Sequence, residues 1–414
     1  MTADQTMVIE HAGEDRFARF RAIKWWDQSL LNRARVLVVG AGALGNEGIK
    51  NLALLGIGNL IVIDRDTIEE SNLSRSVLFT SGDEGKAKAV VAATSAVRIY
   101  PQLRALPIPA NILSDVGLGY FRWADIVVGA LDNREARVFV NQACARVGRP
   151  WIDGGIDILN GIVRGFAPPQ SACYECTMGQ GDWDLLAKRR SCSLLARRAM
   201  AEGGTPTTPT TASVVGAIQA QEVIKHLHGL EVLVGRGFVF EGLTHNSFTV
   251  GYPISPDCPW HDPPADIEAV EEFNSQTPLR QIWNWSESKL GGLDAIDLSR
   301  EMVESLQCTN CGRSAPMFKP LDSITEEDAR CDGCGSERTP TFFHSIARNS
   351  ALLDRSCEQL GLPRWDILWP RCKERALGVE LSGDRRHCLH EAVDSAGDRP
   401  PSRKGGESHG SSLR

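Results

Sequence analysis

Cysteines spaced two residues apart are the side chains of this sequence with the clearest chemical signature. The sequence has 12 cysteines. Three C-x-x-C pairs lie among them, namely Cys173 with Cys176, Cys308 with Cys311, and Cys331 with Cys334. In a reducing compartment such pairs are typical of metal sites rather than disulfides. The last two pairs give C-x2-C-x19-C-x2-C with glycine after each pair, which predicts a zinc ribbon.

A glycine-rich loop is the second candidate for chemistry, because it could bind a phosphate. Gly40, Gly42 and Gly45 form G-x-G-x-x-G directly after the apolar run 35–39. Glycines at these positions let the backbone turn tightly and let a phosphate reach the N–H groups at a helix start. Asp64 lies 19 residues after Gly45, where a carboxylate can accept hydrogen bonds from ribose hydroxyls. The pattern indicates a nucleotide site, although NAD-dependent enzymes share it and a tight turn without a ligand would give the same glycines.

Short apolar runs that alternate with helical patterns must position these residues. The predicted strands are 35–39, 60–63, 125–131 and 157–167, and the predicted helices are 46–55, 85–98, 134–147 and 212–228. Strands that alternate with helices imply an α/β fold, with a mostly parallel, Rossmann-like sheet covered by helices on both faces.

Three segments around the loop resemble blocks of a known superfamily. Segment 64–75 reads DRDTIEESNLSR, segment 86–90 reads KAKAV, and segment 130–137 reads ALDNREAR. They resemble, in consistent order, segments of the ubiquitin-activating-enzyme superfamily, which includes the ThiF-type adenylyltransferases of sulfur carriers. The resemblance spans about residues 15–262 and favours ATP over NAD. It implies that ATP adenylates a C-terminal carboxylate, with Mg2+ offsetting the negative charges.

The resemblance also implies roles for single side chains. Asp64 would hold the ribose, and Asp132 would organise Mg2+ and the reacting phosphate. The other implied nucleotide contacts are Asn72, Arg75, Lys88 and Asn133. Asp66 is a second carboxylate that could touch the metal or its waters, or could be a solvated surface charge.

An arginine near the N-terminus is a further implied contact to ATP. Members of the superfamily supply it from an N-terminal helix, often across a dimer. The segment that begins at Arg16 and reads RFARF is similar to their R-Y-x-R-Q pattern, which points to Arg19. The glutamine is absent here, and Arg16 or Arg21 could serve instead.

The remaining C-x-x-C pair indicates a second zinc site. Superfamily members with a structural zinc ion use two C-x-x-C pairs, the second near the end of the adenylation domain. Here Cys173 and Cys176 are followed, after 81 intervening residues, by Cys258 and His261. This implies a Cys3His site, and the alternative is two unrelated pairs of buried or free thiols.

Cys192 is the candidate for a thioester, since ubiquitin-type activators pass the acyl group to a cysteine on a crossover loop. It is the one cysteine between Cys176 and Cys258. Five cations flank it, namely Lys188, Arg189, Arg190, Arg197 and Arg198. Such cations would favour the thiolate, but an ordinary thiol on a solvated basic helix would show the same pattern.

Composition divides the chain into five regions. They are an ATP-binding adenylation domain at 1–262 with a crossover loop at about 180–211, a linker at 263–295, a zinc-ribbon module at 296–340, a small α+β recruitment unit at 341–392 and a disordered tail at 393–414. The prolines and acidic residues after position 262 indicate the linker.

The expected partners follow from charge and from the resemblance. The net charge of −7 argues against a nucleic-acid partner. The apolar stretch 52–63 is interrupted by Gly56 and Gly58 and is too short to span a membrane. We expect a cytoplasmic protein that acts on a ubiquitin-like protein and passes it to a conjugating-enzyme-like partner. Members of this superfamily commonly form homodimers, and we expect the same here.

Three other functions fit parts of the sequence. One is a sulfur-carrier adenylyltransferase, or a relative that adenylates a small-molecule or tRNA carboxylate, without a thioester step. The second is a binding scaffold that has lost catalysis, and Arg75, Lys88 and Asp132 argue against it. The third is a nicotinamide oxidoreductase, which would bind NAD instead of ATP.

Overall fold

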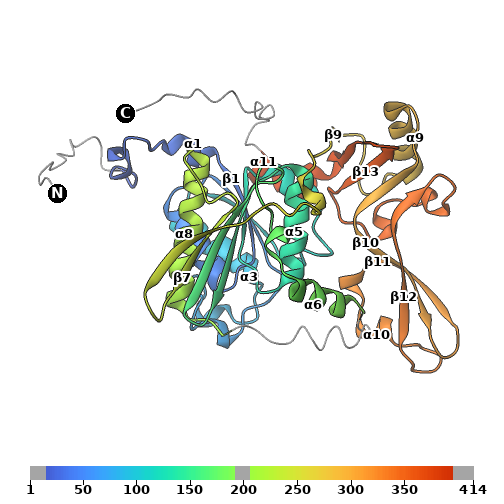
Figure 1. The fold of residues 1–414 in the computed structure, drawn as a ribbon, viewed down its shortest axis with the longest axis horizontal. Coiled ribbons are helices and arrows are strands. Elements are labelled where there is room, and N and C mark those ends of the chain that lie inside the picture. Colours follow the sequence, from blue (N-terminus) through green and yellow to red (C-terminus); the bar gives the residue numbers. More distant parts are fainter. Residues whose placement is uncertain (1–14, 192–205, 395–414) are drawn as a thin grey trace, which may run out of the picture.

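Two β-sheets lie side by side in the computed structural model, which describes residues 15–191 and 206–394 (Figure 1). The first sheet and its helices form one unit, and the second sheet forms a smaller unit beside helix α5. Cys192 and residues 395–414 of the predicted tail lie outside the described residues. Within the described ranges, no helix has both the length and the apolar character needed to cross a bilayer.

The first sheet has eight strands in the order β3-β2-β1-β4-β5-β6-β7-β8. The parallel strands are β1 (Arg35–Val39), β2 (Asn59–Ile63), β3 (Arg104–Ile108), β4 (Ile126–Gly129) and β5 (Trp151–Asp157). The antiparallel strands are β6 (Asn160–Phe166), β7 (Arg236–Glu241) and β8 (Asn246–Gly251). The prediction of a mostly parallel, Rossmann-like sheet is confirmed.

The side chains of β1 point alternately to the two faces of this sheet, and both faces are covered by helices. Val36 and Val38 point into a core with α2 (Ala43–Leu54), α3 (Lys88–Ile99) and α8 (Pro209–Leu227). Leu37 and Val39 point into the opposite core with α4 (Leu118–Trp123) and α5 (Arg134–Val147). All four side chains are at most 1% exposed, as expected for a central parallel strand.

The second sheet has seven strands built around the long strand β10 (Ala295–Cys308). Its other strands are β9 (Ile267–Val270), β11 (Ser314–Pro320), β12 (Arg338–Ala347), β13 (Ile367–Cys372), β14 (Arg375–Ala376) and β15 (Gly378–Leu381). Strand β10 pairs with β11, β12 and β13. The regions predicted as a separate ribbon and a separate C-terminal unit therefore share one sheet.

The region predicted as a linker, 263–295, differs from that expectation. It contains β9, which pairs with β15, and helix α9 (Leu279–Leu290). Ile282 and Trp283 of α9 are 0% and 3% exposed and belong to the core of the second unit. Prolines 263 and 264 suggested a linker, but the apolar face of α9 needs burial and joins the segment to the second sheet.

The two units pack against each other through one shared hydrophobic core. Trp365, Ile367 and Trp369 of the second unit belong to the same buried cluster as Leu37 and the apolar residues of α4 and α5. Helix α11 (Arg385–Asp394) contacts β3 of the first sheet. The second unit therefore covers the α4–α5 side of the first sheet.

Candidate functional site

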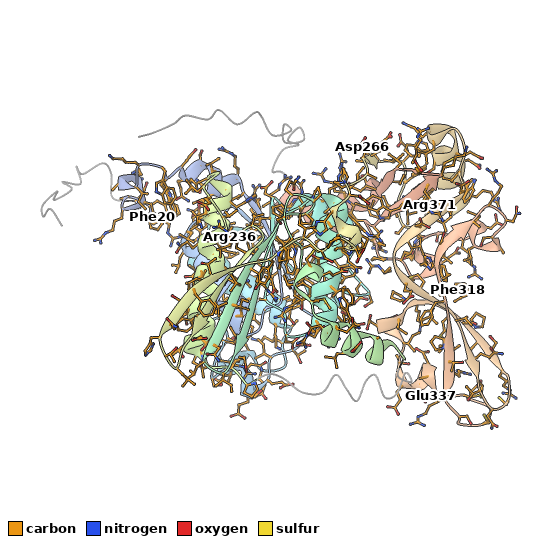
Figure 2. The ribbon with its side chains drawn as sticks, viewed as in Figure 1. Phe20, Arg236, Asp266, Phe318, Glu337 and Arg371 are labelled. Atoms are coloured by element: carbon orange, nitrogen blue, oxygen red, sulfur yellow. The ribbon has the colours of Figure 1, made fainter. Side chains whose placement is uncertain are left out.

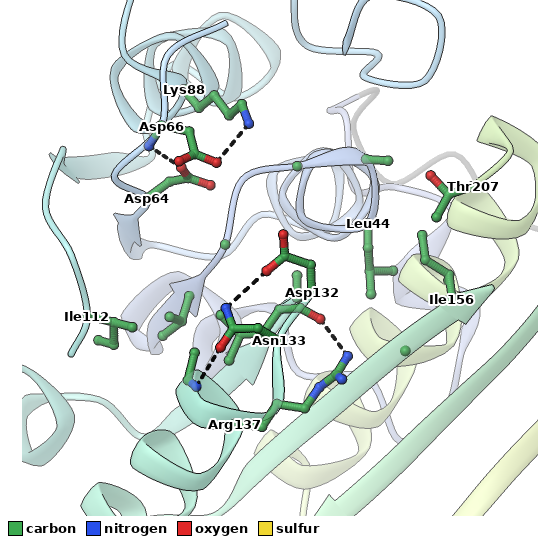
Figure 3. Close-up of a pocket in the computed structure, with 18 of the residues that line it drawn as sticks. Leu44, Asp64, Asp66, Lys88, Ile112, Asp132, Asn133, Arg137, Ile156 and Thr207 are labelled. Atoms are coloured by element: carbon green, nitrogen blue, oxygen red, sulfur yellow. Dashed lines mark hydrogen bonds and ion pairs between the residues drawn. The ribbon is translucent and has the colours of Figure 1, made fainter. Parts of the chain in front are cut away.

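A pocket of about 540 Å³ opens where β1, β2 and β4 end. Parallel strands bring their carboxyl ends to one edge, so the loops that follow them meet there. Figure 3 shows Asp64, Asp66 and Lys88 on one side of this pocket and Asp132 and Asn133 on the other. The volume is that of a small-molecule site.

The glycine loop forms the floor of the pocket, and each glycine has a geometric reason. Gly40 has a φ of +99°, and a Cβ there would lie 2.3 Å from the Ala130 carbonyl oxygen. A Cβ on Gly45 would lie 2.0 Å from the carbonyl oxygen of Gly40. Gly42 has open space around it and stands at the N-cap of α2. The backbone N–H groups at the start of α2 can therefore be approached by an anion.

Asp64 is fixed by the loop it faces. Its two carboxylate oxygens accept hydrogen bonds from the backbone N–H groups of Ala41, at 2.7 Å, and Asp66, at 2.8 Å. Burial raises the pKa of the Asp64 carboxyl, and the two backbone donations oppose that rise. The side chain is held at the pocket edge, where its remaining lone pairs could accept hydrogen bonds from ribose hydroxyls.

The cationic side of the pocket carries Lys88 and Arg75. Lys88 Nζ lies 3.1 Å from the Asp66 carboxylate and is only 13% exposed, whereas Asp66 is 51% exposed. Arg75 donates to the carbonyl oxygen of Ser71 at 2.8 Å. Asn72 is 9% exposed and accepts the N–H of Glu69, so it also stabilises the turn that carries Arg75. A bound phosphate would therefore compete with the Asp66 carboxylate for the Lys88 ammonium group.

Asp132 and Asn133 stand at the start of α5. Asn133 caps the helix by accepting the N–H of Ala136 at 2.8 Å, and its amide donates to Asp132 at 3.1 Å. Asp132 is exposed to the pocket. Its carboxylate oxygens are the ligand type that Mg2+ prefers, so the donor set fits a magnesium site.

Two side chains that support Asp132 were given no role from the sequence. Arg137 donates to the carbonyl oxygens of Leu131 and Gly154 and pairs with Asp153 at 3.0 Å. Asp153 is 0% exposed and also binds Arg164. The available signal was a charged residue, Asp153, beside the apolar residues Trp151 and Ile152 that begin β5, because a buried carboxylate needs such partners.

The N-terminal arginines do not reach this pocket. Arg19 is exposed and is not among the described residues that line the cavity. Arg16 donates to the Ile99 carbonyl at 2.7 Å and stacks on Tyr100, while Arg21 pairs with Asp15. Figure 2 shows Phe20, next to Arg19, on the side of the first unit away from the second. One chain alone thus does not bring the predicted arginine to the site.

The first cysteine cluster has the geometry of a metal centre. Cys173 Sγ lies 3.8 Å from Cys176 Sγ and 3.6 Å from Cys258 Sγ, and Cys176 Sγ lies 3.0 Å from His261 Nε2. Sulfur atoms on one tetrahedral zinc ion lie about 3.8 Å apart, whereas a disulfide needs about 2.0 Å. All four ligand atoms lie within 4.8 Å of one another. These residues could hold a zinc ion.

The second cluster lies at the far end of the second sheet, near Glu337 (Figure 2). Cys308 Sγ lies 3.5 Å from Cys334 Sγ, and Cys311 Sγ lies 3.6 Å from Cys331 Sγ. Gly312 and Gly335 follow the pairs with φ near +72° and +71°, so both turns use a conformation that favours glycine. The four thiols, brought together by β10, β11 and β12, could hold a second zinc ion.

Comparisons with known proteins give similarities over the first unit. The model of the ThiF family matches residues 14–259. The SAMP-activating enzyme E1 of Haloferax volcanii is 33% identical over 240 residues, which are 56% of this chain and 82% of that protein. The sulfur carrier protein adenylyltransferase of Thermus thermophilus is 32% identical over 251 residues, which are 59% of this chain and 88% of that protein.

A solved structure agrees with these matches. The crystal structure of E. coli MccB with AMPCPP and MccA is 25% identical, with a TM-score of 0.50. The alignment covers 59% of this chain and 74% of that chain. The similarity extends over a region of the size of the first unit.

Proposed function

Because the chain belongs to the ThiF family of adenylyltransferases, we propose that it uses ATP to adenylate the C-terminal carboxylate of a ubiquitin-like or sulfur-carrier protein. The observation that carries the proposal is the single pocket that gathers the glycine loop, Asp64, Lys88 and Asp132. The names of two relatives, a SAMP-activating enzyme and a sulfur carrier adenylyltransferase, support a small protein as the substrate.

The proposed reaction joins two anions, and the pocket offers groups that offset their repulsion. A carboxylate oxygen of the substrate attacks the α-phosphorus of ATP, the bond to the bridging oxygen breaks, and pyrophosphate leaves. Lys88 and Arg75 would neutralise charge on the phosphates as it shifts to the leaving group. Asp64 would orient the ribose. Asp132 would hold Mg2+, which supplies further positive charge when bound.

Replacing Lys88 tests the proposal. We expect Lys88→Ala to lower ATP–pyrophosphate exchange in the presence of the carrier protein by at least about 100-fold, because a cation at the developing charge is lost. Lys86→Ala is the matched control, since Lys86 is 57% exposed, pairs with Asp83 and lies outside the described pocket lining. Equal exchange by the two variants would contradict the proposed role of this pocket.

A thioester on Cys192 is the finer part of the proposal. The family's crossover position and the five neighbouring cations support it. The thiolate would attack the acyl-adenylate, forming a thioester and releasing AMP. A conjugating-enzyme-like protein would then accept the acyl group.

We expect Cys192→Ser to abolish the thiol-sensitive adduct with the carrier protein while ATP–pyrophosphate exchange continues. The adduct is measured by gel shift with and without reductant. Cys372→Ser is the control, because Cys372 belongs to neither cysteine cluster. If Cys192→Ser forms every covalent product of the unaltered protein, adenylation without a thioester, as in a sulfur-carrier adenylyltransferase, is the better description.

A further inference from the structure

One wall of the nucleotide pocket is a loop that the second unit supports. The loop connects β3 to α4, and its residues Ala110, Asn111, Ile112 and Leu113 line the pocket. The ThiF family match ends at residue 259, so the supporting residues lie outside the matched region. The support therefore comes from a part of this chain that the family similarity does not describe.

The loop is only partly held by its own bonds. Asp115 accepts the N–H of Asn111 at 2.9 Å, and the Asn111 side chain accepts the N–H of Leu113 at 3.1 Å. The backbone N–H groups of Ser114 and Asp115 also donate to the Asn111 carbonyl. These bonds shape the turn, but none of them reaches the carbonyl groups of Leu113 and Val116. Ile112 and Val116 point into the core that the two units share.

Arg300 of β10 provides that anchor. Its guanidinium donates to the carbonyl oxygens of Leu113 at 3.1 Å and Val116 at 2.8 Å. The side chain is 5% exposed and stacks over Phe139 of α5, with its carbon Cζ 5.2 Å from the ring centre. A planar guanidinium can bridge two carbonyl groups in this way, which an ammonium group cannot do with the same geometry.

A buried carboxylate completes the contact. Asp366 is 0% exposed, lies 3.7 Å from the Arg300 guanidinium and accepts the backbone N–H of Leu118 at 2.9 Å. It also accepts the hydroxyl of Ser299 at 2.9 Å. Arg300 and Asp366 thus hold the end of the loop and the first residue of α4 as one charge-compensated group.

We propose that Arg300 is a positioning residue for the nucleotide pocket, so that the second unit completes the ATP site without touching the nucleotide. The inference rests on the proposed function for the identity of the ligand. Loss of Arg300 would release the carbonyls of Leu113 and Val116. The pocket wall formed by 110–113 would then sample several positions, and binding would have to order it again.

The experiment uses the full chain with Arg300→Met, which keeps much of the side-chain length but removes the donors. Hydrogen exchange of the segment 110–118 is measured without nucleotide, and MgATP affinity is measured by calorimetry. We expect faster exchange in this segment but not in α2, and a Kd for MgATP raised roughly tenfold. Arg300→Lys should give an intermediate Kd, because it keeps the charge but not the two-carbonyl bridge.

Arg348→Met is the matched control. Arg348 also lies in the second unit, stacks on Trp283 and pairs with Glu287, but it is 57% exposed and contacts Leu293 instead of the pocket loop. It should leave both measurements unchanged. If Arg300→Met does not fold because Asp366 is left unpaired, Arg300→Met with Asp366→Asn removes both charges and serves in its place.

The outcomes separate the two proposals. Unchanged exchange in a folded Arg300 variant, or faster exchange with an unchanged Kd, overturns the positioning role. If the unaltered protein does not bind MgATP, the proposed function fails, and the exchange measurement still decides whether Arg300 holds the loop.

Discussion

At the scale of single residues, the site depends on charges that are compensated inside the protein. Asp153 is fully buried and lies between the guanidinium groups of Arg137 and Arg164. Arg137 in turn binds the carbonyl of Leu131, directly before Asp132. The position of Asp132 therefore depends on a buried ion cluster as well as on its own helix cap.

We expect Asp153→Asn to lower the free energy of unfolding by about 3 kcal/mol, because two largely buried guanidinium groups would lose their counter-charge. Urea denaturation of the full chain measures the change. Asp297→Asn is the control, since Asp297 and its partner Arg371 are 30% and 45% exposed and their pair should contribute less than about 1 kcal/mol. A similar loss for both variants would contradict this difference between buried and exposed pairs.

The sequence was informative about residues whose roles depend on their neighbours in the chain. The spacing of Gly40, Gly42 and Gly45 predicts a turn and a helix start, and the structure has both there. Arg300 lacks such a signal, because its partners are carbonyl groups 184 and 187 positions earlier in the chain. Backbone carbonyls are present at every residue, so a pattern of side chains cannot reveal which of them an arginine will reach.

At the scale of elements, helix α4 joins the two units by close packing. Gly119 faces the indole of Trp365, and a Cβ there would lie 2.5 Å from three of its ring atoms. Trp365 is 2% exposed, and its Nε1 donates to Glu380 at 2.6 Å, so the ring cannot move aside freely. The absence of a side chain at position 119 is what permits the contact.

We expect Gly119→Ala to lower the free energy of unfolding by about 2 kcal/mol, since the new methyl group overpacks a rigid neighbour. Gly48→Ala in α2 is the matched control, because a Cβ there meets open space and should raise the stability by about 0.5–1 kcal/mol. Denaturant midpoints measure both. Stabilisation by Gly119→Ala would indicate that α4 and Trp365 pack less tightly than described.

Elements with strong periodicity were predictable, whereas their assignment to units was not. Strands β1, β2 and β4 were predicted because each is an apolar run that ends at glycine or aspartate. Strands β3 and β5 were not predicted, since β3 contains Arg104 and Pro107 and β5 contains Asp153 and two glycines. Strand β9 has only four residues, and its partner β15 lies about a hundred positions further along the chain. The local sequence therefore gives little sign that a strand forms there. Composition therefore indicated a linker where tertiary contacts form a strand and a helix.

At the scale of the whole molecule, the two cysteine clusters tie together distant parts of the chain. The first joins the loop at 173–176 to the segment at 258–261, and Trp260 within it stacks on Arg146, whose guanidinium also contacts Trp369 of the second unit. The second cluster closes the far end of the second sheet. The two clusters occupy separate places, so their metal ions should be separable by substitution.

We expect about two zinc ions per chain in the unaltered protein and about one in either Cys176→Ser or Cys311→Ser, measured by mass spectrometry of the metal. Both variants should unfold at a lower temperature, because metal binding contributes to folding. Cys372→Ser should keep both ions. A single ion in the unaltered protein, or two ions in either cluster variant, would contradict the two-site description.

The shared core also has a consequence for the time at which the protein can fold. The N–H of Leu118 finds its partner in Asp366, which is 248 residues further along the chain. At the usual rate of synthesis, this partner is made roughly 12 to 50 s after Leu118. During that interval the apolar face of α4 has no cover from the second unit. The nascent chain therefore exposes an apolar surface on the ribosome, and its yield in the cell should depend on chaperones that shield this face until residues 365–369 have emerged.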